Sequence, residues 1–346
     1  MRAVVYKGYG RTPKVREVPE PTPPPNGAVI KVASSGVCRS DWHAWQGHDP
    51  VPLPHTPGHE FAGVVSAVGP KVKRAKIGDR VTAPFVCGCG RCDFCRRGEA
   101  QVCPNQSQPG FSHPGSFAEY VAVNAADTNL VPLPKGVPMT AAAALGCRFA
   151  TAFRALIGHG RLAPDQTVAV FGCGGVGLSA VMIATALKAR VIAVDVSPRA
   201  LDAAADLGAV ETVRADASDP AVVIRDLTDG GAHLTIDAIG SPEIVATAIR
   251  SLRRRGRHVQ VGLLLGDSAM TAVPMDQVIS RELEIYGSHG MPAIDYPAML
   301  DLIVRGKLHP ERLIGRTITL AEAPDALAAM GKPADVPGLT VIDFSD

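Results

Sequence analysis

The feature that most constrains the fold is a regular alternation of strand-like and helix-like segments between about residues 140 and 286. Six short apolar runs predict strands at 168–171, 191–194, 211–213, 234–237, 258–261 and 283–286. Helices are predicted between them at 177–188, 198–207, 220–228 and 242–250. Because helices that join parallel strands form right-handed crossovers, the pattern predicts a doubly wound, six-stranded parallel sheet with helices on both faces.

The rest of the chain has a different texture. Up to about residue 138 it is rich in Pro and Gly, with β-prone runs at 28–32, 61–68 and 117–123, which is typical of an irregular β-rich domain. After residue 286 a helix at 296–305 and strands at 316–320 and 339–343 remain. A chain of 346 residues exceeds one ordinary core. We therefore predict a β-rich domain of residues 1–148 and 287–346, with an α/β domain of residues 149–286 inserted into it.

The charge balance favours a small-molecule partner. The sequence has 35 Lys and Arg residues against 33 Asp and Glu residues, so it has no net field to attract nucleic acid or an anionic membrane. One basic run is predicted to end a helix as a solvated cluster: Arg253, Arg254, Arg255 and Arg257. The start of the chain has no signal-peptide pattern and no apolar run reaches about 18 residues, so we expect a cytoplasmic protein that does not enter a membrane.

A glycine-rich turn follows the first strand of the alternating region and reads Gly172-Cys173-Gly174-Gly175-Val176-Gly177. Gly172 allows the tight turn, Gly174 lets backbone approach a pyrophosphate, and Gly177 lets the next helix pack close to the strand. Asp195 ends the second strand, where a carboxylate accepts hydrogen bonds from a ribose 2′-hydroxyl and repels a 2′-phosphate. The arrangement predicts a dinucleotide site that prefers NAD to NADP, although Arg199 could contact the ribose or a 2′-phosphate.

Four cysteines lie two, two and seven residues apart in one segment, at Cys89, Cys92, Cys95 and Cys103. Two-residue gaps let a tight loop aim successive thiolates at one Zn²⁺ ion, and four thiolates close its coordination shell. The segment therefore predicts a structural zinc lobe with no position for substrate. A disulfide framework and unrelated core cysteines are the alternatives, and Cys87 could compete as a ligand.

Three further candidate ligands are scattered along the chain: Cys38 in GVCRSDWHAW, His59 in PGHEFAG and Cys147 in ALGCRFATAF. Together they would form a Cys₂His set with one open position, which is typical of a catalytic zinc site. No two of them are close in sequence, and a single buried cysteine is more often part of a core. Spacing alone leaves both interpretations open.

Taken together, these segments resemble the zinc-dependent alcohol dehydrogenases of the medium-chain dehydrogenase/reductase superfamily. The similarity covers nearly the whole chain, with GVCRSDWH, GHE, the four-cysteine segment, LGC, GCGGVG and the following acid in the same order. The resemblance implies a GroES-like catalytic domain and a Rossmann domain. It also implies two zinc ions per chain, one catalytic and one structural.

The resemblance implies roles for the scattered ligands. Cys38, His59 and Cys147 would hold the catalytic zinc, with Glu60 as an occasional alternative ligand. Asp41 would orient His59, and it could also cap the helix that begins at SDWH.

It also implies a proton relay and a set of cofactor contacts. Ser40 would accept the alcohol proton and pass it through the nicotinamide ribose to His43, which could instead be an ordinary exposed histidine. Arg39 would bind the cofactor pyrophosphate, with a salt-bridged surface arginine as the alternative, and Thr151 would pack behind the nicotinamide ring. The remaining cofactor-binding candidates are Gly175, Val176, Val261 and Leu263.

The substrate pocket is where the match to the family is imperfect. Ser40, Trp42 and Phe85 would line the pocket, but simple-alcohol members usually carry a bulky apolar residue where this chain has Asp49. Asp49 could favour a polar substrate or face solvent. Leu339 stands where family members often have an arginine that contacts a cofactor phosphate, so we expect one phosphate contact to be absent.

The resemblance thus implies reversible hydride transfer between NAD and a primary or secondary alcohol, which becomes an aldehyde or ketone. The alternative is a polyol or amino-alcohol dehydrogenase of the same superfamily. Those relatives often have an acidic group in place of the third ligand, so Cys147 favours the alcohol type. Asp49 nevertheless keeps the polyol or amino-alcohol alternative open. A zinc-stabilised nucleic-acid binder and a non-catalytic nucleotide-binding protein are hypotheses from other classes, and the balanced charge argues against the first. From similar proteins we expect a homo-oligomer, either a dimer or a tetramer.

Overall fold

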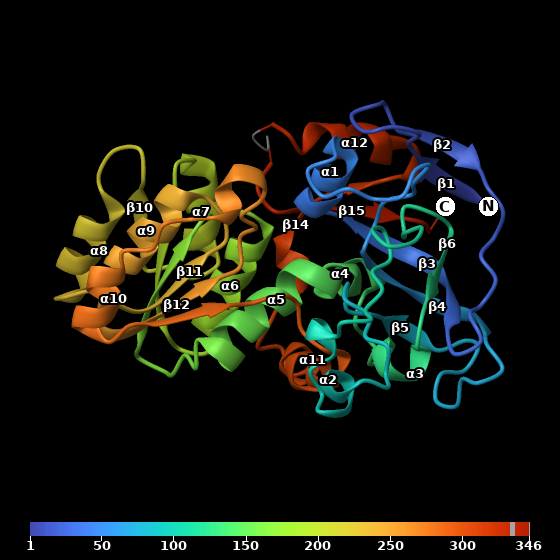
Figure 1. Ribbon diagram of the computed structural model, residues 1–346, viewed down its shortest axis with the longest axis horizontal. Helices are drawn as coiled ribbons and strands as arrows, with labels where there is room; N and C mark the ends of the chain where they lie inside the picture. The colour runs from blue at the N-terminus through green and yellow to red at the C-terminus, as the bar shows by residue number, and fades with distance from the viewer. Residues whose placement is uncertain (333–335, 346) are drawn as a thin grey trace. The chain divides into compact units, whose positions relative to one another are not determined.

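The computed structural model describes residues 1–332 and 336–345 (Figure 1). The chain divides into two compact units. Unit 1 consists of Met1–Ala150 and Gly290–Asp346, and unit 2 consists of Thr151–His289. The first and last strands of the chain therefore belong to the same unit.

Unit 2 is built on a parallel sheet, drawn green to orange in Figure 1, with strand order β10-β9-β8-β11-β12-β13. Its strands are β8 (Thr167–Phe171), β9 (Arg190–Asp195), β10 (Glu211–Arg214), β11 (Ala232–Asp237), β12 (Leu252–Gln260) and β13 (Glu284–Gly287). The chain starts in the middle at β8, runs outward to β10, and returns to β11 on the other side of β8. The sheet is therefore doubly wound and six-stranded, as predicted.

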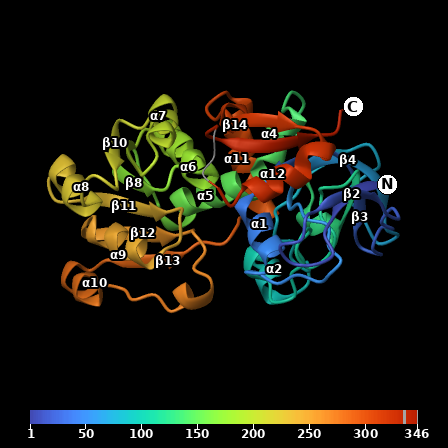
Figure 2. The same ribbon diagram turned by 90° about the horizontal axis from the view of Figure 1, so that it is seen from above.

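Helices connect these strands. They are α6 (Gly175–Ala186), α7 (Pro198–Asp206), α8 (Pro220–Thr228), α9 (Pro242–Arg250) and α10 (Met275–Arg281). In α7, α8 and α9 a proline opens the helix and the preceding Ser197, Asp219 or Ser241 side chain accepts a backbone N–H hydrogen bond. Proline suits this position because its missing N–H would be unpaired there, and the polar side chain satisfies one of the neighbouring N–H groups. Within unit 2, α6 contacts α7, and α8 contacts α9 (Figure 2).

The helix end predicted for one basic run is wrong: Arg253, Arg254, Arg255 and Arg257 lie on β12, because α9 already ends at Arg250. A bulge accommodates the run, since the register between β11 and β12 shifts between Ala232 and Leu234 and Arg255 adopts a φ of 59°. The first three arginines are exposed, whereas Arg257 is half-buried and lies 3.2 Å from the Glu284 carboxylate. Because the strand is bulged and its first arginines are all exposed, the sequence lacks the alternation of apolar and polar residues that would have predicted a strand here.

Unit 1 is β-rich and contains a seven-stranded sheet of order β14-β15-β3-β4-β5-β7, in which β6 also pairs with β3. Two further strands, β1 and β2, form a separate hairpin-like pair. The strands are β1 (Arg2–Val5), β2 (Lys14–Glu17), β3 (Ala28–Val37), β4 (Glu60–Val68), β5 (Arg80–Thr82), β6 (Tyr120–Val123), β7 (Val131–Pro132), β14 (Ile314–Ile318) and β15 (Leu339–Asp343). Because β15 pairs with β3, the segment that follows unit 2 completes the sheet begun near the N-terminus.

Short helices surround this sheet. In unit 1 they are α1 (Arg39–Gln46), α2 (Asp93–Arg96), α3 (Ala126–Asn129), α4 (Met139–Ala143), α11 (Tyr296–Val304) and α12 (Ala323–Ala329). The short helix α5 (Ala150–Arg154) starts at the last residue before unit 2 and otherwise belongs to unit 2. Ala44 and Trp45 of α1 are buried in a core with Val37, Phe117 and Leu327. Burying side chains of this size contributes about 1.5–3 kcal/mol each. This core fixes α1 directly after β3, where the candidate site begins.

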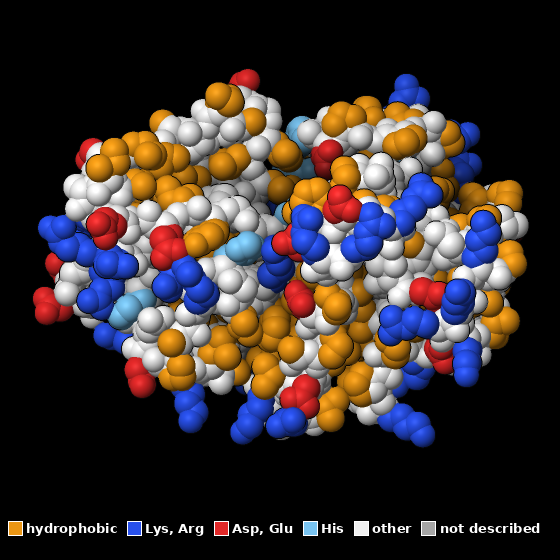
Figure 3. All heavy atoms as spheres, turned by 60° about the horizontal axis from the view of Figure 1, so that its bottom comes forward, with side chains coloured by type: hydrophobic (Ala, Val, Ile, Leu, Met, Phe, Trp, Pro, Cys, Tyr) orange, Lys and Arg blue, Asp and Glu red, His pale blue; other side chains and the backbone are white. Residues whose placement is uncertain are grey.

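The surface carries both signs of charge. On the face drawn in Figure 3, basic and acidic side chains are interspersed rather than gathered into a stripe of one sign. Within residues 1–332 and 336–345, none of the helices combines the length and apolar character that crossing a bilayer requires.

Candidate active site

Two strand ends and one helical turn bring four potential metal ligands together in unit 1. Cys38 follows β3, while His59 and Glu60 lie at the start of β4, and these two strands pair with Gly36 opposite Glu60. Cys147 lies in a π-helical turn, Leu145–Phe149, that contacts β4. The two thiol sulfurs, a nitrogen of His59 and an oxygen of Glu60 all lie within 4.8 Å of one another. Residues that sequence spacing could not link therefore meet at one point.

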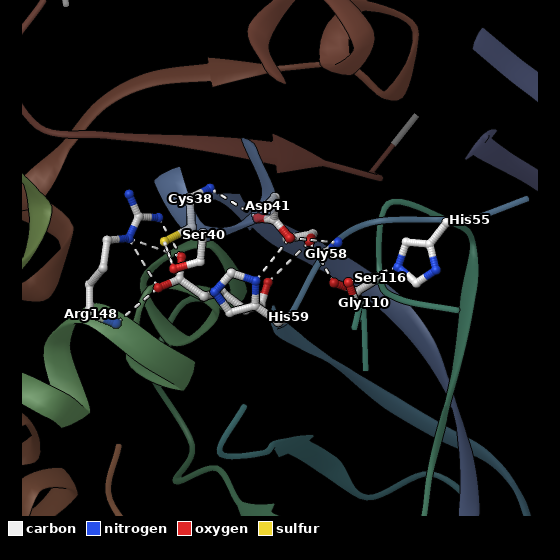
Figure 4. Close-up of polar contacts among 11 residues, drawn as sticks. Cys38, Ser40, Asp41, His55, Gly58, His59, Gly110, Ser116 and Arg148 are labelled. Carbon is white, nitrogen blue, oxygen red and sulfur yellow. Dashed lines mark hydrogen bonds and ion pairs between the residues drawn. The ribbon is translucent and has the colours of Figure 1, made fainter. Parts of the chain in front are cut away.

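Asp41 fixes the ring of His59, as Figure 4 shows. His59 Nδ1 donates to Asp41 Oδ1 at 2.9 Å, and the same carboxylate accepts the backbone N–H groups of Gly58 at 2.9 Å and Cys38 at 3.2 Å. The Cys38 contact belongs to a capping box at the start of α1, in which Cys38 is the N-cap and Asp41 is the third helical residue rather than the N-cap. Burial lowers the pKa of His59, but the charge and hydrogen bond of Asp41 together with the nearby Cys38 outweigh burial and hold that pKa well above its usual value.

The other ring nitrogen of His59 indicates which kind of ligand the cluster can bind. Nε2 is buried and has no hydrogen-bond partner among the residues that the structure describes. A carboxylate on one imidazole nitrogen and a metal ion on the other is the usual arrangement of a metal-bound histidine. Two thiols and one imidazole are donors that suit Zn²⁺. The cluster therefore fits a zinc ion.

Glu60 is held by Arg148, a residue that sequence reasoning missed. Arg148 Nε donates to both carboxylate oxygens of Glu60, at 3.0 and 3.1 Å, and Nη2 donates to Oε2. Burial alone would lower the pKa of Arg148, but the Glu60 carboxylate raises it above its usual value. The two residues are 88 positions apart. The one local signal was a charged residue in the otherwise apolar segment that follows Cys147.

The four-cysteine segment forms a second cluster in unit 1. The sulfurs of Cys89, Cys92, Cys95 and Cys103 lie within 4.8 Å of one another. The backbone N–H groups of Cys89 and Asn105 point at Cys103 Sγ, at 3.4 and 3.3 Å. The helix between these ligands, α2, has no buried residue. The lobe thus lacks an apolar core of its own, and four sulfurs at one point fit a closed zinc shell.

Two cysteines lie outside both clusters. Cys87 is buried in the core of unit 1, its thiol contacts the Pro84 carbonyl oxygen at 3.5 Å, and burial raises its pKa to about 12. Cys173 is buried in the glycine turn, where burial raises its pKa to about 12. None of the eight cysteines is disulfide-bonded. Cys87 and Cys173 are thus buried thiols that belong to neither cluster.

The glycine turn in unit 2 has the geometry that its sequence predicts. Gly172 adopts a φ of 91°, and a Cβ atom on Gly177 would overlap the Gly172 carbonyl oxygen. Gly174 caps α6 and is exposed, and a Cβ atom there would meet no protein atom within 4 Å. Gly175 and Val176 form the first turn of α6. Backbone N–H groups at this helix N-terminus are accessible to an anion such as a pyrophosphate.

Asp195 lies beside this turn at the end of β9. Its Oδ2 accepts the Cys173 backbone N–H at 2.7 Å, and its Oδ1 accepts the Ser197 backbone N–H at 2.8 Å. Each carboxylate oxygen has two lone pairs, so each keeps one for a ribose hydroxyl. Asp195 therefore both shapes the turn and presents acceptors beside it.

The other predicted cofactor residues of unit 2 are more dispersed. Val261 and Leu263 follow the carboxyl end of β12, where open parallel sheets bind their ligands. Arg199 is exposed on the first turn of α7. Thr151 is buried in α5, at the start of unit 2.

Known proteins match both the fold and these motifs. Residues 24–135 match the family model for an alcohol dehydrogenase GroES-like domain, and residues 175–305 match the model for a zinc-binding dehydrogenase. An alcohol dehydrogenase of Geobacillus stearothermophilus is 32% identical over 96% of this chain and 96% of its own length. The chain belongs to the zinc-type alcohol dehydrogenases of the medium-chain dehydrogenase/reductase superfamily. The resemblance seen in the sequence is confirmed.

Two further matches extend this comparison. A sorbitol dehydrogenase of Halalkalibacterium halodurans is 32% identical over 95% of the dehydrogenase chain described here and 96% of its own length. The solved structure of an alcohol dehydrogenase from Thermus sp. ATN1 matches with a TM-score of 0.91 and 31% identity, and the match covers 99% of both chains. The mixed fold of a GroES-like domain and a parallel-sheet domain is thus confirmed.

Helix α1 of the dehydrogenase carries Ser40 and His43, the two residues of the expected relay. Ser40 Oγ lies 3.9 Å from Cys38 Sγ, and His43 lies one helical turn further along. His43 Nδ1 is 3.1 Å from Nδ1 of His48, a contact that sequence reasoning missed. Burial lowers the pKa of His43, and the charges of Arg39 and His48 lower it further. His43 is therefore a neutral base near pH 7.

The structure places Arg39 against protein groups. Its Nη1 donates to the Met330 carbonyl oxygen at 2.7 Å, and its guanidinium lies 4.8 Å from the centre of the Trp42 ring. Arg39 is exposed. Four of its five N–H donors thus have no protein acceptor in the contacts described here.

Aromatic rings border the metal-ligand cluster of this dehydrogenase. The ring of Phe85 lies 6.0 Å from the His59 ring in a T-shaped contact, and the half-buried Phe111 lies 5.1 Å from it. Phe111 was missed because QPGFSHPG has no periodicity that gives its direction. Asp49 is exposed just after α1, and Leu339 is buried at the start of β15.

Proposed function

We propose that this dehydrogenase transfers hydride reversibly between a primary or secondary alcohol and NAD, with Cys38, His59 and Cys147 as ligands of a catalytic zinc. The observation that carries the proposal is the buried His59 ring, fixed by Asp41 on one side and unpartnered on the other, near two thiols. Three protein ligands leave one position for the substrate. When bound, zinc acts as a Lewis acid that lowers the pKa of an alcohol hydroxyl.

The side chains of α1 move the proton that the alcohol releases. As the family resemblance implies, Ser40 would accept it and His43 would be the final acceptor, with a ribose hydroxyl of bound NAD lying between them. Burial, Arg39 and His48 lower the pKa of His43, which favours the neutral ring, and a neutral ring has a nitrogen that can accept a proton. Phe85 and Phe111 contribute apolar walls that exclude water from the buried ligands.

A second zinc ion is proposed for the lobe formed by the four-cysteine segment. Metal analysis joined to an NADH-absorbance screen of primary, secondary, aromatic and polyol substrates tests both parts of the proposal. We expect about two zinc ions per chain and NADH formation with at least one alcohol. One zinc ion, with no NADH from any alcohol, would contradict it.

A polyol dehydrogenase is the second candidate function. Two observations favour it: a sorbitol dehydrogenase is as similar as the alcohol dehydrogenase compared above, and Asp49 is a carboxylate after α1. Comparing kcat/KM for sorbitol with that for simple alcohols separates the candidates. A higher value for sorbitol that falls in Asp49→Leu would make this the function.

Asp195→Gly is expected to lower the ratio of NAD to NADP activity about 10- to 100-fold. The change removes the acceptors for a ribose hydroxyl, worth about 1.5–3 kcal/mol for a charged partner, and the charge that repels a 2′-phosphate. Initial rates with both cofactors measure the ratio. Asp195→Asn, which keeps one acceptor oxygen, should lie between, and Asp202→Ala on the exposed face of α7 is the control. An unchanged ratio in Asp195→Gly would refute the assignment.

Arg39→Ala is expected to raise the KM for NAD about 10-fold or more. Arg39 is the cationic side chain proposed to bind the pyrophosphate, and Leu339 leaves one family phosphate contact absent. Steady-state kinetics at saturating alcohol measure the change, with the exposed Arg16→Ala as the control. A KM equal to that of the wild type would remove Arg39 from the cofactor site.

Assembly and location stay predictions. A dimer or tetramer is expected from similar proteins, and sedimentation velocity at micromolar concentration distinguishes both from a monomer. A cytoplasmic location remains the expectation from the sequence.

A further inference from the structure

One residue, Arg148, supplies all the hydrogen bonds that the structure describes to the Glu60 carboxylate. Oε1 accepts the backbone N–H and the Nε–H of Arg148, both at 3.0 Å. Oε2 accepts Nε–H at 3.1 Å and also Nη2–H. A carboxylate has about four lone-pair sites. Three N–H donors of Arg148, one of them shared by both oxygens, therefore take up most of these sites, and the two side-chain donors hold the carboxylate toward Arg148.

Glu60 nevertheless lies within reach of the metal-ligand cluster. One of its oxygens is within 4.8 Å of the Cys38 and Cys147 sulfurs and of a His59 nitrogen. Its side chain is 0% exposed and that of Arg148 is 8% exposed, so water does not compete for either charge. A buried carboxylate that lost its arginine would need another cation nearby. A metal ion held by Cys38, His59 and Cys147 would be that cation.

The sheet provides a place for this ion pair. Gly36 lies opposite Glu60 across β3 and β4. A Cβ atom on Gly36 would overlap Glu60 Oε2 and lie 3.0 Å from Arg148 Nη2. Any larger residue at this position would push the two side chains apart. The carboxylate is thus seated on the strand beside Arg148.

Arg148 also offsets one of the negative charges beside the metal-ligand cluster. Two thiolates and Glu60 carry three negative charges, and a zinc ion supplies two positive charges. Arg148 supplies the third, and Figure 4 shows its side chain reaching toward Cys38 and His59. Because Arg148 directly follows Cys147 in the π-helical turn, one backbone segment carries both a metal ligand and the partner of a competing ligand.

We propose that Arg148 is a positioning residue that withholds Glu60 from the metal ion and thereby keeps the fourth coordination position open. The inference rests on the proposed function, since it requires zinc at Cys38, His59 and Cys147. Without Arg148, Glu60 becomes the fourth protein ligand, and the site becomes a closed one.

The test uses the full chain with Co²⁺ in place of zinc and imidazole as the probe of the open position. Visible absorption reports cobalt coordination, and the lobe of four cysteines does not respond to imidazole because its shell is closed. In the wild type, imidazole should shift the cobalt bands. In Arg148→Met, the bands should differ before imidazole is added, and the affinity for imidazole should fall about 10-fold or more.

Further variants separate this effect from simple damage. The double variant Arg148→Met with Glu60→Gln should regain the imidazole response, because an amide is a weak metal ligand. Arg148→Lys keeps the charge but loses the forked contact, so it should fold even where Arg148→Met does not and should bind imidazole with intermediate affinity. Arg257→Met removes the arginine of another Arg–Glu pair, in unit 2, and should match the wild type.

The outcomes are distinct. If Arg148→Met has wild-type spectra and wild-type imidazole affinity, the inference is wrong while the proposed function stands. The same result in Arg148→Lys has the same meaning where Arg148→Lys is the variant that folds. If the double variant loses as much imidazole affinity as Arg148→Met, the inference is also wrong, because the effect of Arg148 would then not depend on Glu60. A wild-type protein whose cobalt bands ignore imidazole would instead overturn the open metal site on which the proposed function rests.

Discussion

Cys38→Ser is expected to give a folded protein that has lost at least about 10³-fold in kcat/KM. The serine hydroxyl is a poor zinc ligand, so the site loses the Lewis acid, which is worth several kcal/mol of transition-state stabilisation. A tenfold change in rate corresponds to about 1.36 kcal/mol. NADH absorbance measures the rate, and metal analysis should show a fall of about one zinc ion per chain.

The fold should survive this change for a structural reason. Cys38 lies at the junction of β3 and α1, and that junction is held by Asp41 and by the buried Ala44 and Trp45 rather than by the thiol. Circular dichroism and the unfolding midpoint should therefore stay close to wild type. Cys87→Ser, which changes a buried cysteine outside both clusters, is the matched control and should keep its activity. Wild-type turnover in Cys38→Ser would exclude Cys38 as a ligand.

Cys92→Ser is expected to act on stability rather than chemistry. The lobe has almost no core, since α2 buries none of its side chains and Ala100, Gln101 and Cys103 are the buried residues of the segment 89–103. A structural zinc site can add on the order of 10 kcal/mol to folding, so the loss of one thiolate should cost several kcal/mol. Urea unfolding should show a lower midpoint, and the purified protein should contain less zinc.

Cys87→Ser is again the control variant. Removing the metal ion with a chelator tests independently whether the stability of the lobe depends on it. A strong chelator should lower the unfolding midpoint of the wild type further than that of Cys92→Ser, because the variant has already lost the ion from its lobe. If Cys92→Ser unfolds at the wild-type midpoint, the lobe does not depend on a metal ion, and its four sulfurs have another explanation.

Local features of the sequence located the regular elements of unit 2 well. Ser197, Asp219 and Ser241 each precede a proline, and the helix begins at that proline in all three cases. The glycine turn was predictable for the same reason, because its geometry depends on consecutive residues. Signals of this kind act over a single turn, so one sequence is enough to detect them.

The contacts that tertiary structure creates could not be predicted. Glu60 and Arg148 meet because β4 passes the π-helical turn, and nothing near either residue indicates the other. Phe111 packs on His59 from a loop without periodicity. The metal-ligand cluster itself was reached through family resemblance, since the separations between Cys38, His59 and Cys147 carry no local signal.

The pairing of β15 with β3 has a consequence for the order in which the protein folds during synthesis. It joins residues 34–37 to residues 340–343, so this part of the sheet closes with a strand that follows unit 2 in the chain. The sheet of unit 2 uses strands between Thr167 and Gly287, all of which leave the ribosome earlier. Since domains tend to fold as they emerge, the parallel sheet of unit 2 can form first, and the end of β3 beside Cys38, which already pairs with β4, gains its neighbour on the other side only after unit 2.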